Sequence, residues 1–157
     1  MGTATVKIVG YDLRYAKAFA ALNYEWIETF FRVEDEDRKA LEDPEGYAIN
    51  PGGEIFFLLE NDVAVGTAAM VPYGSDKLYE LAKMAVRPDK RGLGYGSRLM
   101  QRCVDFARDR NADEVMLVTN DILAPALATY EAAGFRPVEN YTDSRYERGN
   151  LEMRLRL

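Results

Sequence analysis

The order of apolar and polar residues along the chain predicts strands and helices in a mixed sequence. Short apolar runs bounded by turn residues, and residues that alternate in polarity, predict strands. Asp12 is predicted to cap a helix that runs to about Phe31, because apolar residues spaced at threes and fours, such as Phe19, Leu22 and Trp26, then share one face. The other predicted helices cover about 35–41, 92–110 and 124–133, and the predicted strands cover about 5–9, 54–60, 63–71, 77–86, 114–119, 135–141 and 145–157.

No repeat, linker or low-complexity segment interrupts this pattern. The chain of 157 residues is therefore expected to form a single domain over residues 1–157, long enough to bury a core of its own. Strands and helices in this order predict an α/β (α+β) fold in which helices flank a mixed sheet.

The clearest chemical signal lies between Glu80 and Met100, where an apolar strand leads into a basic, glycine-rich turn and then a helix. Gly92, Gly94 and Gly96 have no Cβ, so the backbone can come within hydrogen-bonding distance of a bulky anion. The free N–H groups of the helix's first turn, together with the helix dipole, favour negative charge at the same place. The turn therefore predicts a pyrophosphate-binding site, and the alternative is a glycine-rich helix start that binds no ligand.

Two common phosphate-binding patterns do not fit this turn. The Walker pattern requires Gly, four residues and then Gly-Lys-Ser/Thr, and the dinucleotide pattern requires Gly-x-Gly-x-x-Gly near the start of a βαβ unit. The run Arg91-Gly92-Leu93-Gly94-Tyr95-Gly96, after a strand that ends Met84-Ala85-Val86, instead resembles the acetyl-CoA loop of the GNAT superfamily of N-acetyltransferases.

Other segments extend the resemblance over most of the chain. Downstream, Tyr130, Gly134 and Phe135 match the Tyr-x-x-x-Gly-Phe ending of the superfamily's next helix. Upstream, residues 22–27 and 41–44 are similar to the amino-terminal half of a bacterial subgroup.

The resemblance implies the GNAT fold, a mixed and mostly antiparallel sheet of about seven strands flanked by about four helices, with the fourth and fifth strands splayed. It implies acetyl-CoA as acetyl donor and no metal. The pantetheine arm would pair with the backbone of Met84, Ala85 and Val86, and the amide of Met84 or Ala85 would point at the thioester carbonyl. The expected pyrophosphate site consists of Arg91, Gly92, Leu93, Gly94, Tyr95, Gly96 and Ser97.

The resemblance also implies two catalytic side chains. Glu80 matches the position of a catalytic glutamate in some members and could take the ammonium proton directly or through a water. The alternative for Glu80 is a cross-strand ion pair with a lysine or arginine. Tyr130 matches a tyrosine that donates a proton to the departing thiolate, and the alternative is an aromatic ring that only packs. Many members carry a cofactor-binding asparagine seven residues before this tyrosine. Leu123 stands there, and Asn120 is the substitute we consider.

Composition narrows the possible chemistry. The chain has no histidine, which excludes histidine-dependent nucleophiles, histidine metal sites and a histidine base. The single cysteine, Cys103, shares a predicted helix face with Leu99 and Met100 and is expected in the core. Since one cysteine allows no intrachain disulfide and residues 1–10 carry no apolar signal-peptide core, a cytoplasmic location is expected. No apolar run approaches the roughly 20 residues of a membrane helix.

Charge is distributed unevenly along the chain. The net charge is −6, which argues against nucleic acid as a partner. Residues 83–110 nevertheless hold eight Lys or Arg against three acids, a local excess of five (8 − 3) that suits the phosphates of coenzyme A. The acidic run Glu34–Asp37 has two interpretations: a solvated helix start, which we favour, or a group that attracts a cationic amine.

The expected partners are acetyl-CoA and a small amine, with no nucleic acid and no membrane, and with a homodimer left open. In the family, acceptor walls come from segments that correspond to about 31–37 and 140–146. Tyr141, Asp143, Arg145 and Tyr146 combine aromatic rings with both charge signs, which suits a zwitterion such as an amino acid or short peptide, and equally a polyamine. Two rival functions are a non-catalytic acyl-CoA-binding module of the same fold and a nucleotide-binding protein.

Overall fold

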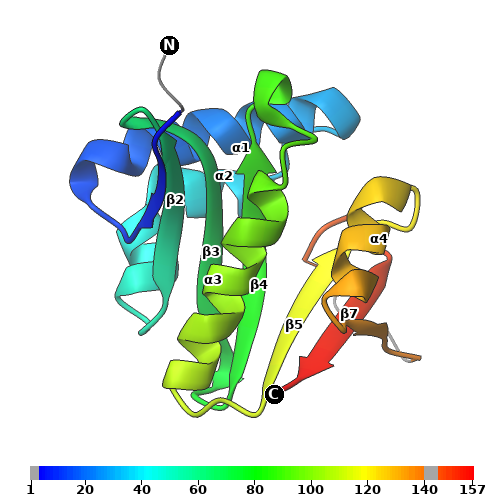
Figure 1. Cartoon of the computed structure of the whole chain (residues 1–157). Helices are drawn as coiled ribbons and strands as arrows, with labels where there is room; N and C mark the ends of the chain where they lie inside the picture. Colours follow the sequence, from blue (N-terminus) through cyan, green and yellow to red (C-terminus); the bar gives the residue numbers. More distant parts are fainter. Residues whose placement is uncertain (1–3, 140–144) are drawn as a thin grey trace.

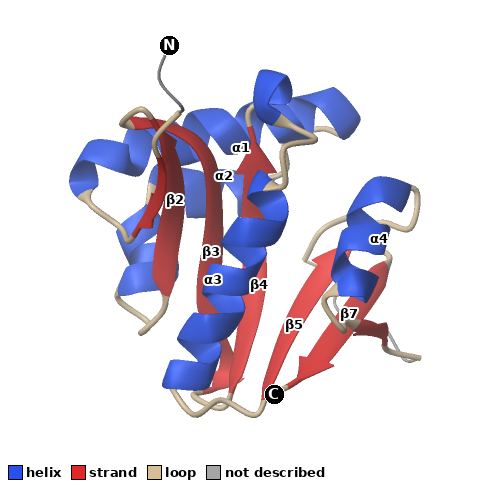
Figure 2. Cartoon of the chain, viewed as in Figure 1, coloured by secondary structure: helices blue, strands red, loops and turns tan. Residues whose placement is uncertain are grey.

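The computed structural model describes residues 4–139 and 145–157 and contains a seven-stranded sheet in the order β1-β2-β3-β4-β5-β7-β6 (Figures 1 and 2). The strands are β1 (Val6–Val9), β2 (Glu54–Glu60), β3 (Val63–Ser75), β4 (Leu78–Val86), β5 (Glu114–Thr119), β6 (Arg136–Pro137) and β7 (Leu151–Arg156). The α-helices are α1 (Ala16–Phe30), α2 (Asp35–Glu42), α3 (Tyr95–Asp109) and α4 (Ala124–Ala132), and short turns of other helix types cover Leu13–Tyr15, Glu45–Ile49 and Pro88–Lys90. None of the helices in these described parts is long and apolar enough to cross a membrane.

The sheet opens between β4 and β5. Strands β1 to β4 pair antiparallel, as do β5, β7 and β6, whereas β4 and β5 are parallel. The parallel pairing covers only Leu78↔Glu114, Tyr79↔Val115 and Glu80↔Met116. Beyond this point the two strands diverge toward their carboxyl ends, as Figure 1 shows. This confirms the predicted mixed, mostly antiparallel sheet with splayed fourth and fifth strands.

Helices cover both faces of the β1–β4 half, and this explains the uninterrupted apolar run of β2. Ile55 and Phe57 pack in one cluster with residues of α1, while Phe56 and Leu58 pack in a second cluster with residues of α3. Successive side chains of a strand point to opposite faces, so a strand covered on both sides is apolar at nearly every position. The prediction that Cys103 lies in the core is confirmed, because its exposure is 0%.

Local turn chemistry shapes two other elements. Asn61 and Asp62 join β2 to β3 with φ values of 50° and 67°, the left-handed pair that a two-residue hairpin requires. Asp12 is a cap, as predicted, because its Oδ1 accepts a hydrogen bond from the Arg14 amide at 2.9 Å. It caps a short 3₁₀ turn, however, and α1 itself begins at Ala16.

The prediction of a final strand over 145–157 is wrong in its first half. Strand β7 begins at Leu151, and residues 145–150 form a loop. Within the described residues, the strand predicted over 135–141 is reduced to Arg136–Pro137. The reason is electrostatic: the side chains of Arg145 and Arg148 bond to carboxylates of β4 and α2, so the loop lies across the opening of the sheet.

Candidate active site

Strand β4 contains a bulge within the candidate site. The register with β3 jumps from Thr67↔Ala85 to Ala69↔Ala82, so two residues of β4 stand opposite one of β3. Lys83 occupies the bulge with a φ of 53°, a left-handed conformation that non-glycine residues rarely adopt. The bulge lies three residues beyond Glu80, the last residue of β4 that pairs with β5, so the strand is irregular where the sheet opens.

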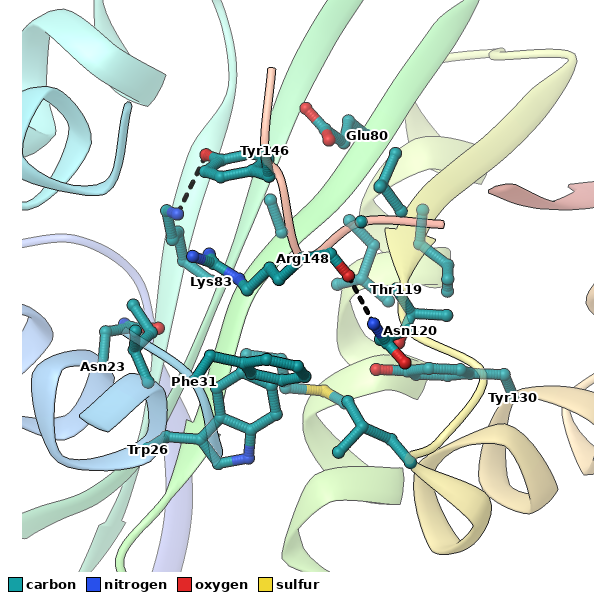
Figure 3. Close-up of a pocket in the computed structure, with 18 residues that line it drawn as sticks. Asn23, Trp26, Phe31, Glu80, Lys83, Thr119, Asn120, Tyr130, Tyr146 and Arg148 are labelled. Carbon is teal, nitrogen blue, oxygen red and sulfur yellow. Dashed lines mark hydrogen bonds between the residues drawn. The ribbon is translucent and has the colours of Figure 1, made fainter. Parts of the chain in front are cut away.

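A cavity lies in this opening (Figure 3). Its walls come from α1, β4, β5, α4 and the 145–150 loop. The lining residues are Asn23, Trp26, Ile27, Phe31, Glu80, Leu81, Ala82, Lys83, Met84, Leu117, Val118, Thr119, Asn120, Leu123, Tyr130, Tyr146, Arg148 and Gly149. The cavity thus gathers both predicted catalytic residues, together with Met84 and Asn120. Tyr141 and Asp143 lie outside the described residues.

The last part of β4 has backbone groups that β3 does not use. The amide of Arg87 donates to the carbonyl of Val65 at 2.8 Å. Because hydrogen-bonding direction alternates along an antiparallel pair, Ala85 also directs its backbone to β3, while Val86 directs its backbone to the open side. The Val86 carbonyl there accepts a hydrogen bond from Arg91 Nε at 3.0 Å. An extended ligand could therefore pair with this edge of β4.

The glycine turn has the open backbone that the sequence predicts. Gly92 and Gly94 both have φ of 82°, and Gly94 is the residue that precedes α3. A Cβ added to Gly92, Gly94 or Gly96 would meet no atom of the described residues within 4 Å, apart from its chain neighbours and the backbone of its own helix. The left-handed backbone explains why Gly92 and Gly94 are glycines. Packing against other described residues does not explain a glycine at any of the three positions. Close approach of a ligand gives all three a reason.

The side chains of the glycine turn differ in their exposure and in their hydrogen-bond partners. Leu93 is 57% exposed, and Ser97 is also exposed. Arg91 donates to Glu25 of α1 at 2.9 Å, so its guanidinium is anchored to α1. Tyr95 is buried and donates to Glu60 at the end of β2, so only its backbone amide can face a ligand at the turn.

Glu80 is held in an ion pair. It is 4% exposed, and its two oxygens accept hydrogen bonds from Arg145 at 2.9 and 2.6 Å. The guanidinium of Arg145 also lies 5.3 Å from the ring centroid of Tyr73 and 5.8 Å from that of Tyr146. The ion-pair alternative for Glu80 is therefore present, with an arginine from the loop and not from a neighbouring strand.

Asp37 forms a second, fully buried ionic centre. Its carboxylate, 0% exposed, accepts hydrogen bonds from Lys83 Nζ at 2.6 Å and from both terminal nitrogens of Arg148 at 2.7 and 2.6 Å. Burial alone would raise the pKa of Asp37, but the Arg148 hydrogen bonds and the Lys83 charge lower it to about 2. Burial lowers the pKa of Lys83 below its usual value despite the Asp37 charge.

The interpretation of Glu34–Asp37 as a solvated helix start is thus wrong for two of its residues. The Glu34 side chain and Asp37 form a reciprocal capping box at the start of α2, and the Glu34 side chain is only 12% exposed. Only the middle of the run faces water, with the Asp35 side chain 90% exposed. The sequence could not show this, because the partners of Asp37 lie 46 and 111 residues away.

The 145–150 loop closes the cavity from the open side. The Tyr146 hydroxyl accepts a hydrogen bond from Lys83 at 3.0 Å, and the Arg148 carbonyl accepts one from Asn120 Nδ2 at 2.6 Å (Figure 3). Asn120 Oδ1 accepts from the Ile122 amide at 3.0 Å, so both ends of this amide are bonded within the chain. Asn120 lines the cavity, and its side chain holds the 145–150 loop through the hydrogen bond to the Arg148 carbonyl.

Tyr130 lies at the other end of the cavity from Glu80 and comes from α4 (Figure 3). Its ring packs edge-on against Phe135, with centroids 6.2 Å apart. Burial raises the pKa of Tyr130 to about 12, so its hydroxyl is protonated at neutral pH. Among the described residues this hydroxyl has no hydrogen-bond partner, and Tyr130 is partly buried at the cavity, so a ligand group that bonds to the hydroxyl would stabilise it.

Apart from the 145–150 loop, the residues that line the cavity lie within the part of the chain that a family model matches. The family model described as "Acetyltransferase (GNAT) family" matches residues 20–135. The chain belongs to this family. The matched range includes most of α1, the glycine turn and Tyr130, and it confirms the resemblance drawn from the sequence.

Curated relatives match about half of this chain. An uncharacterized N-acetyltransferase of Schizosaccharomyces pombe is 32% identical over 82 residues, which are 52% of this chain and 50% of the relative. An amino-acid acetyltransferase of Edwardsiella ictaluri is 32% identical over 87 residues, which are 55% of this chain and 19% of the relative. The chain therefore spans half or less of the length of these relatives.

Solved GNAT structures share the whole fold. An acetyltransferase of the GNAT family from Staphylococcus aureus superposes with a TM-score of 0.86 at 21% identity and covers 97% of this chain and 99% of its own. A provisionally assigned acetyltransferase from Salmonella typhimurium, solved with its cofactor acetyl-CoA, has a TM-score of 0.72 at 19% identity and covers 96% and 93%. Because the sequence identities are below 25%, these structural similarities establish the fold alone.

Sequence reasoning missed several residues of this GNAT cavity. Lys83 and Arg148 were not predicted as site residues, nor were Asn23 and Trp26 of α1. One signal was available: Lys83 interrupts the apolar strand that ends at Val86, and a charge inside a buried strand requires a partner. Across residues 4–139 and 145–157, no group of three or more Cys, Asp or Glu residues is placed to hold a metal ion.

Proposed function

We propose that the protein transfers the acetyl group of acetyl-CoA to the primary amine of a small molecule, amino acid or peptide by direct attack in a ternary complex. The observation that carries this proposal is the Tyr130 hydroxyl, which is partly buried and protonated at neutral pH. It has no partner among the described residues and faces a cavity beside the free edge of β4. A module that only binds acyl-CoA has no need of such an acid.

The residues present fit acetyl-CoA as a substrate. The open glycine turn before α3 would take the pyrophosphate on backbone amides, with the helix dipole in support. The pantetheine arm would extend along β4, where Val86 directs its backbone to the open side. Between the two amides considered for the thioester carbonyl, the geometry favours Met84, because Ala85 turns its backbone toward β3.

The transfer has a simple balance. The amine nitrogen attacks the thioester carbonyl carbon and forms the C–N bond, and the C–S bond then breaks. One ammonium proton leaves before attack and a second leaves the nitrogen afterwards, while the departing thiolate takes up one proton. An alkylammonium and acetyl-CoA thus give the N-acetyl amine, coenzyme A and one proton released to solvent.

Tyr130 is the proposed acid for the thiolate. Its pKa of about 12 keeps it protonated before the reaction. A thiol in water has a pKa of about 8.5, so full transfer from such a weak acid is uphill, and a strong hydrogen bond to the developing thiolate is the main expected contribution. After the C–S bond breaks, solvent can complete the protonation.

Glu80 is the proposed base, but it must first change partners. Both of its oxygens are occupied by Arg145. It also lies at the far end of the cavity from Tyr130 (Figure 3), so proton transfer from an amine near the thioester would pass through a water.

The test is acetyl-CoA-dependent thiol release with a panel of amines, on the parent protein and on Tyr130→Phe. We expect turnover with at least one amine, and a loss of turnover in the variant with unchanged acetyl-CoA affinity. If acetyl-CoA binds and no amine is acetylated, the non-catalytic acyl-CoA-binding module becomes the better account. If ATP or NAD binds in preference to acetyl-CoA, both accounts fail.

A further inference from the structure

One wall of the cavity comes from α1. Asn23 lies three residues before Trp26 and four before Ile27, so the three side chains share one face of the helix, and all three line the cavity. Phe31 follows the helix and packs against Trp26, with ring centroids 6.0 Å apart. In Figure 3, Asn23 lies beside α1 on one side of the cavity and Tyr130 lies on the other. With the coenzyme sulfur beside Tyr130, α1 borders the space that is left for the acceptor.

The side-chain amide of Asn23 is oriented by the helix itself. Asn23 is 2% exposed, and its Nδ2 donates a hydrogen bond to the carbonyl of Phe19, one turn earlier, at 3.0 Å. The opposite orientation would place Oδ1 against that carbonyl, and two acceptors repel each other, so this bond fixes which end of the amide is the oxygen. Among the described residues, Asn23 Oδ1 accepts no hydrogen bond. A buried residue that lines the cavity therefore has an oxygen without a partner.

Asn23 is the exception among the buried Asn, Asp, Glu and Thr side chains of residues 4–139 and 145–157. The carboxylates of Asp37, Glu80 and Glu152 each accept hydrogen bonds from an arginine side chain. The Thr67 hydroxyl donates to a backbone carbonyl at 2.9 Å. A buried amide carbonyl without a hydrogen bond is costly, and leucine, which has nearly the same size, would fill the position without that cost. The oxygen of Asn23 is therefore expected to bond to a molecule in the cavity.

The chemistry of this oxygen restricts the group that it can bind. A carbonyl oxygen only accepts hydrogen bonds, so the ligand must present an N–H or O–H group. In a ternary complex such a group belongs either to the acceptor or to the amides of the pantetheine arm. The acceptor is favoured, because the arm is expected along the edge of β4 and at Tyr130, across the cavity from Asn23. The reacting amine is expected there too, so the group at Asn23 is a second one. The rings of Trp26 and Phe31 offer an apolar surface for the carbon chain between the two.

We propose that Asn23 is a specificity-determining residue that selects primary amines with a second hydrogen-bond donor, an O–H or N–H group on the same carbon chain. The second donor bonds to Asn23 Oδ1, the chain lies along Trp26 and Phe31, and the reacting amine is held toward the thioester. An acceptor without this donor leaves the buried carbonyl unpaired and is acetylated more slowly. This inference rests on the proposed acetyl transfer and narrows its acceptor.

The test compares matched acceptors by kcat/KM in the thiol-release assay. Amino alcohols of increasing chain length are each paired with their O-methyl ether, and linear diamines are each paired with the monoamine of equal length. We expect the parent to favour the donor-bearing member of at least one pair by about tenfold or more, as for the gain of one buried hydrogen bond. In Asn23→Leu this ratio should fall to about one, while acetyl-CoA affinity, measured by calorimetry, stays at the parent value.

Stability separates this role from a structural one. Asn23→Leu removes a buried polar group and nearly keeps its volume, so the midpoint of denaturant unfolding should equal or exceed that of the parent. A residue that served only through its bond to Phe19 would show a lower midpoint and an unchanged ratio. Thr29→Val is a matched control: Thr29 of α1 also donates to the carbonyl four residues earlier, at 2.7 Å, but it is exposed and does not line the cavity of the described chain. This control should leave the ratio at the parent value.

Two outcomes concern the ligand of Asn23. If Asn23→Leu does not bind acetyl-CoA, Asn23→Ala removes the same carbonyl without the larger side chain, and a parent-like ratio in that variant overturns the inference. A variant that binds acetyl-CoA more weakly and keeps the parent ratio would assign Oδ1 to the pantetheine arm, which also overturns it.

The remaining outcomes separate acceptor selection from acetyl transfer. If amines are acetylated without preference for a second donor, or if Asn23→Leu lowers kcat/KM equally for both members of every pair, selection by Asn23 is refuted while acetyl transfer stands. If no amine of any series is acetylated although acetyl-CoA binds, the proposed function fails and this inference fails with it.

Discussion

Gly96→Ala should stabilise the protein and weaken its binding of acetyl-CoA. Gly96 is the second residue of α3, and its φ is not in the left-handed range. Among the described residues, a Cβ at this position meets no atom within 4 Å beyond its chain neighbours and its own helix backbone. The substitution therefore causes no strain or clash in the free protein. Alanine restricts the unfolded chain more than glycine does and favours helix, so stability should rise by about 0.4–1 kcal/mol.

The effect on binding has the opposite sign. A methyl group at Gly96 would project from the backbone that we expect to contact the pyrophosphate. Loss of one charge-assisted hydrogen bond from an amide costs about 1.5–3 kcal/mol, which corresponds to a roughly 10- to 100-fold weaker affinity. Gly94 is a poorer position for this test, because its φ of 82° would add backbone strain to any substitution.

Two measurements check this prediction: denaturant unfolding for stability and calorimetry for acetyl-CoA affinity. Gln101→Ala is a matched control, because Gln101 is an exposed residue of the same helix. Among the described residues, its side chain forms a hydrogen bond only with Asp105. The control should bind acetyl-CoA as the parent does. If Gly96→Ala is folded and binds acetyl-CoA with parental affinity, the pyrophosphate does not lie against this turn.

Three further predictions concern polar groups in and beside the cavity. Tyr130→Phe should reduce turnover by about 10- to 100-fold with little change in stability, and less for thioesters whose leaving thiol is more acidic; equal losses for all thioesters would contradict the role. Glu80→Gln should lower kcat/KM by about 10²-fold, with partial recovery at high pH where free amine is abundant, whereas a loss that is the same at every pH would indicate a structural role. Asp37→Asn should destabilise the protein by about 3–5 kcal/mol in denaturant unfolding, because Lys83 and Arg148 lose their buried partner; a variant as stable as the parent would refute this. The pKa of Asp37 is about 2 in the folded state, below its unfolded value. The contribution of Asp37 to stability is therefore complete above the unfolded pKa and is lost as the pH falls toward 2. Unfolding measured over a pH series, in the parent and in Asp37→Asn, checks this.

Local sequence signals predicted the elements that local physics determines. The apolar run over 54–60 identified a strand, and Gly92, Gly94 and Gly96 identified the turn before α3. Each of these depends on residues within one or two turns of the chain. The splay of β4 and β5 came from the family resemblance, because no local pattern encodes where a parallel pairing stops.

The sequence could not reveal the ionic arrangement around the cavity. Asp37 and Arg148 are 111 residues apart, and Glu80 and Arg145 are 65 apart. Residues 145–157 were predicted as one continuous strand, yet the first six residues form a loop whose conformation depends on those distant carboxylates. The polarity of Arg145 and Arg148 was visible in the sequence, but the identity of their partners was not.

The central claim is that acetyl-CoA binds between the diverging ends of β4 and β5 with its sulfur beside Tyr130. A crystal structure of the protein with acetyl-CoA tests this most directly. We expect the pyrophosphate on the amides of the glycine turn, the thioester carbonyl at the Met84 amide, and the Tyr130 hydroxyl within hydrogen-bonding distance of the sulfur, roughly 3–3.5 Å. A cofactor bound elsewhere, or a Tyr130 hydroxyl directed away from the sulfur, would contradict the account.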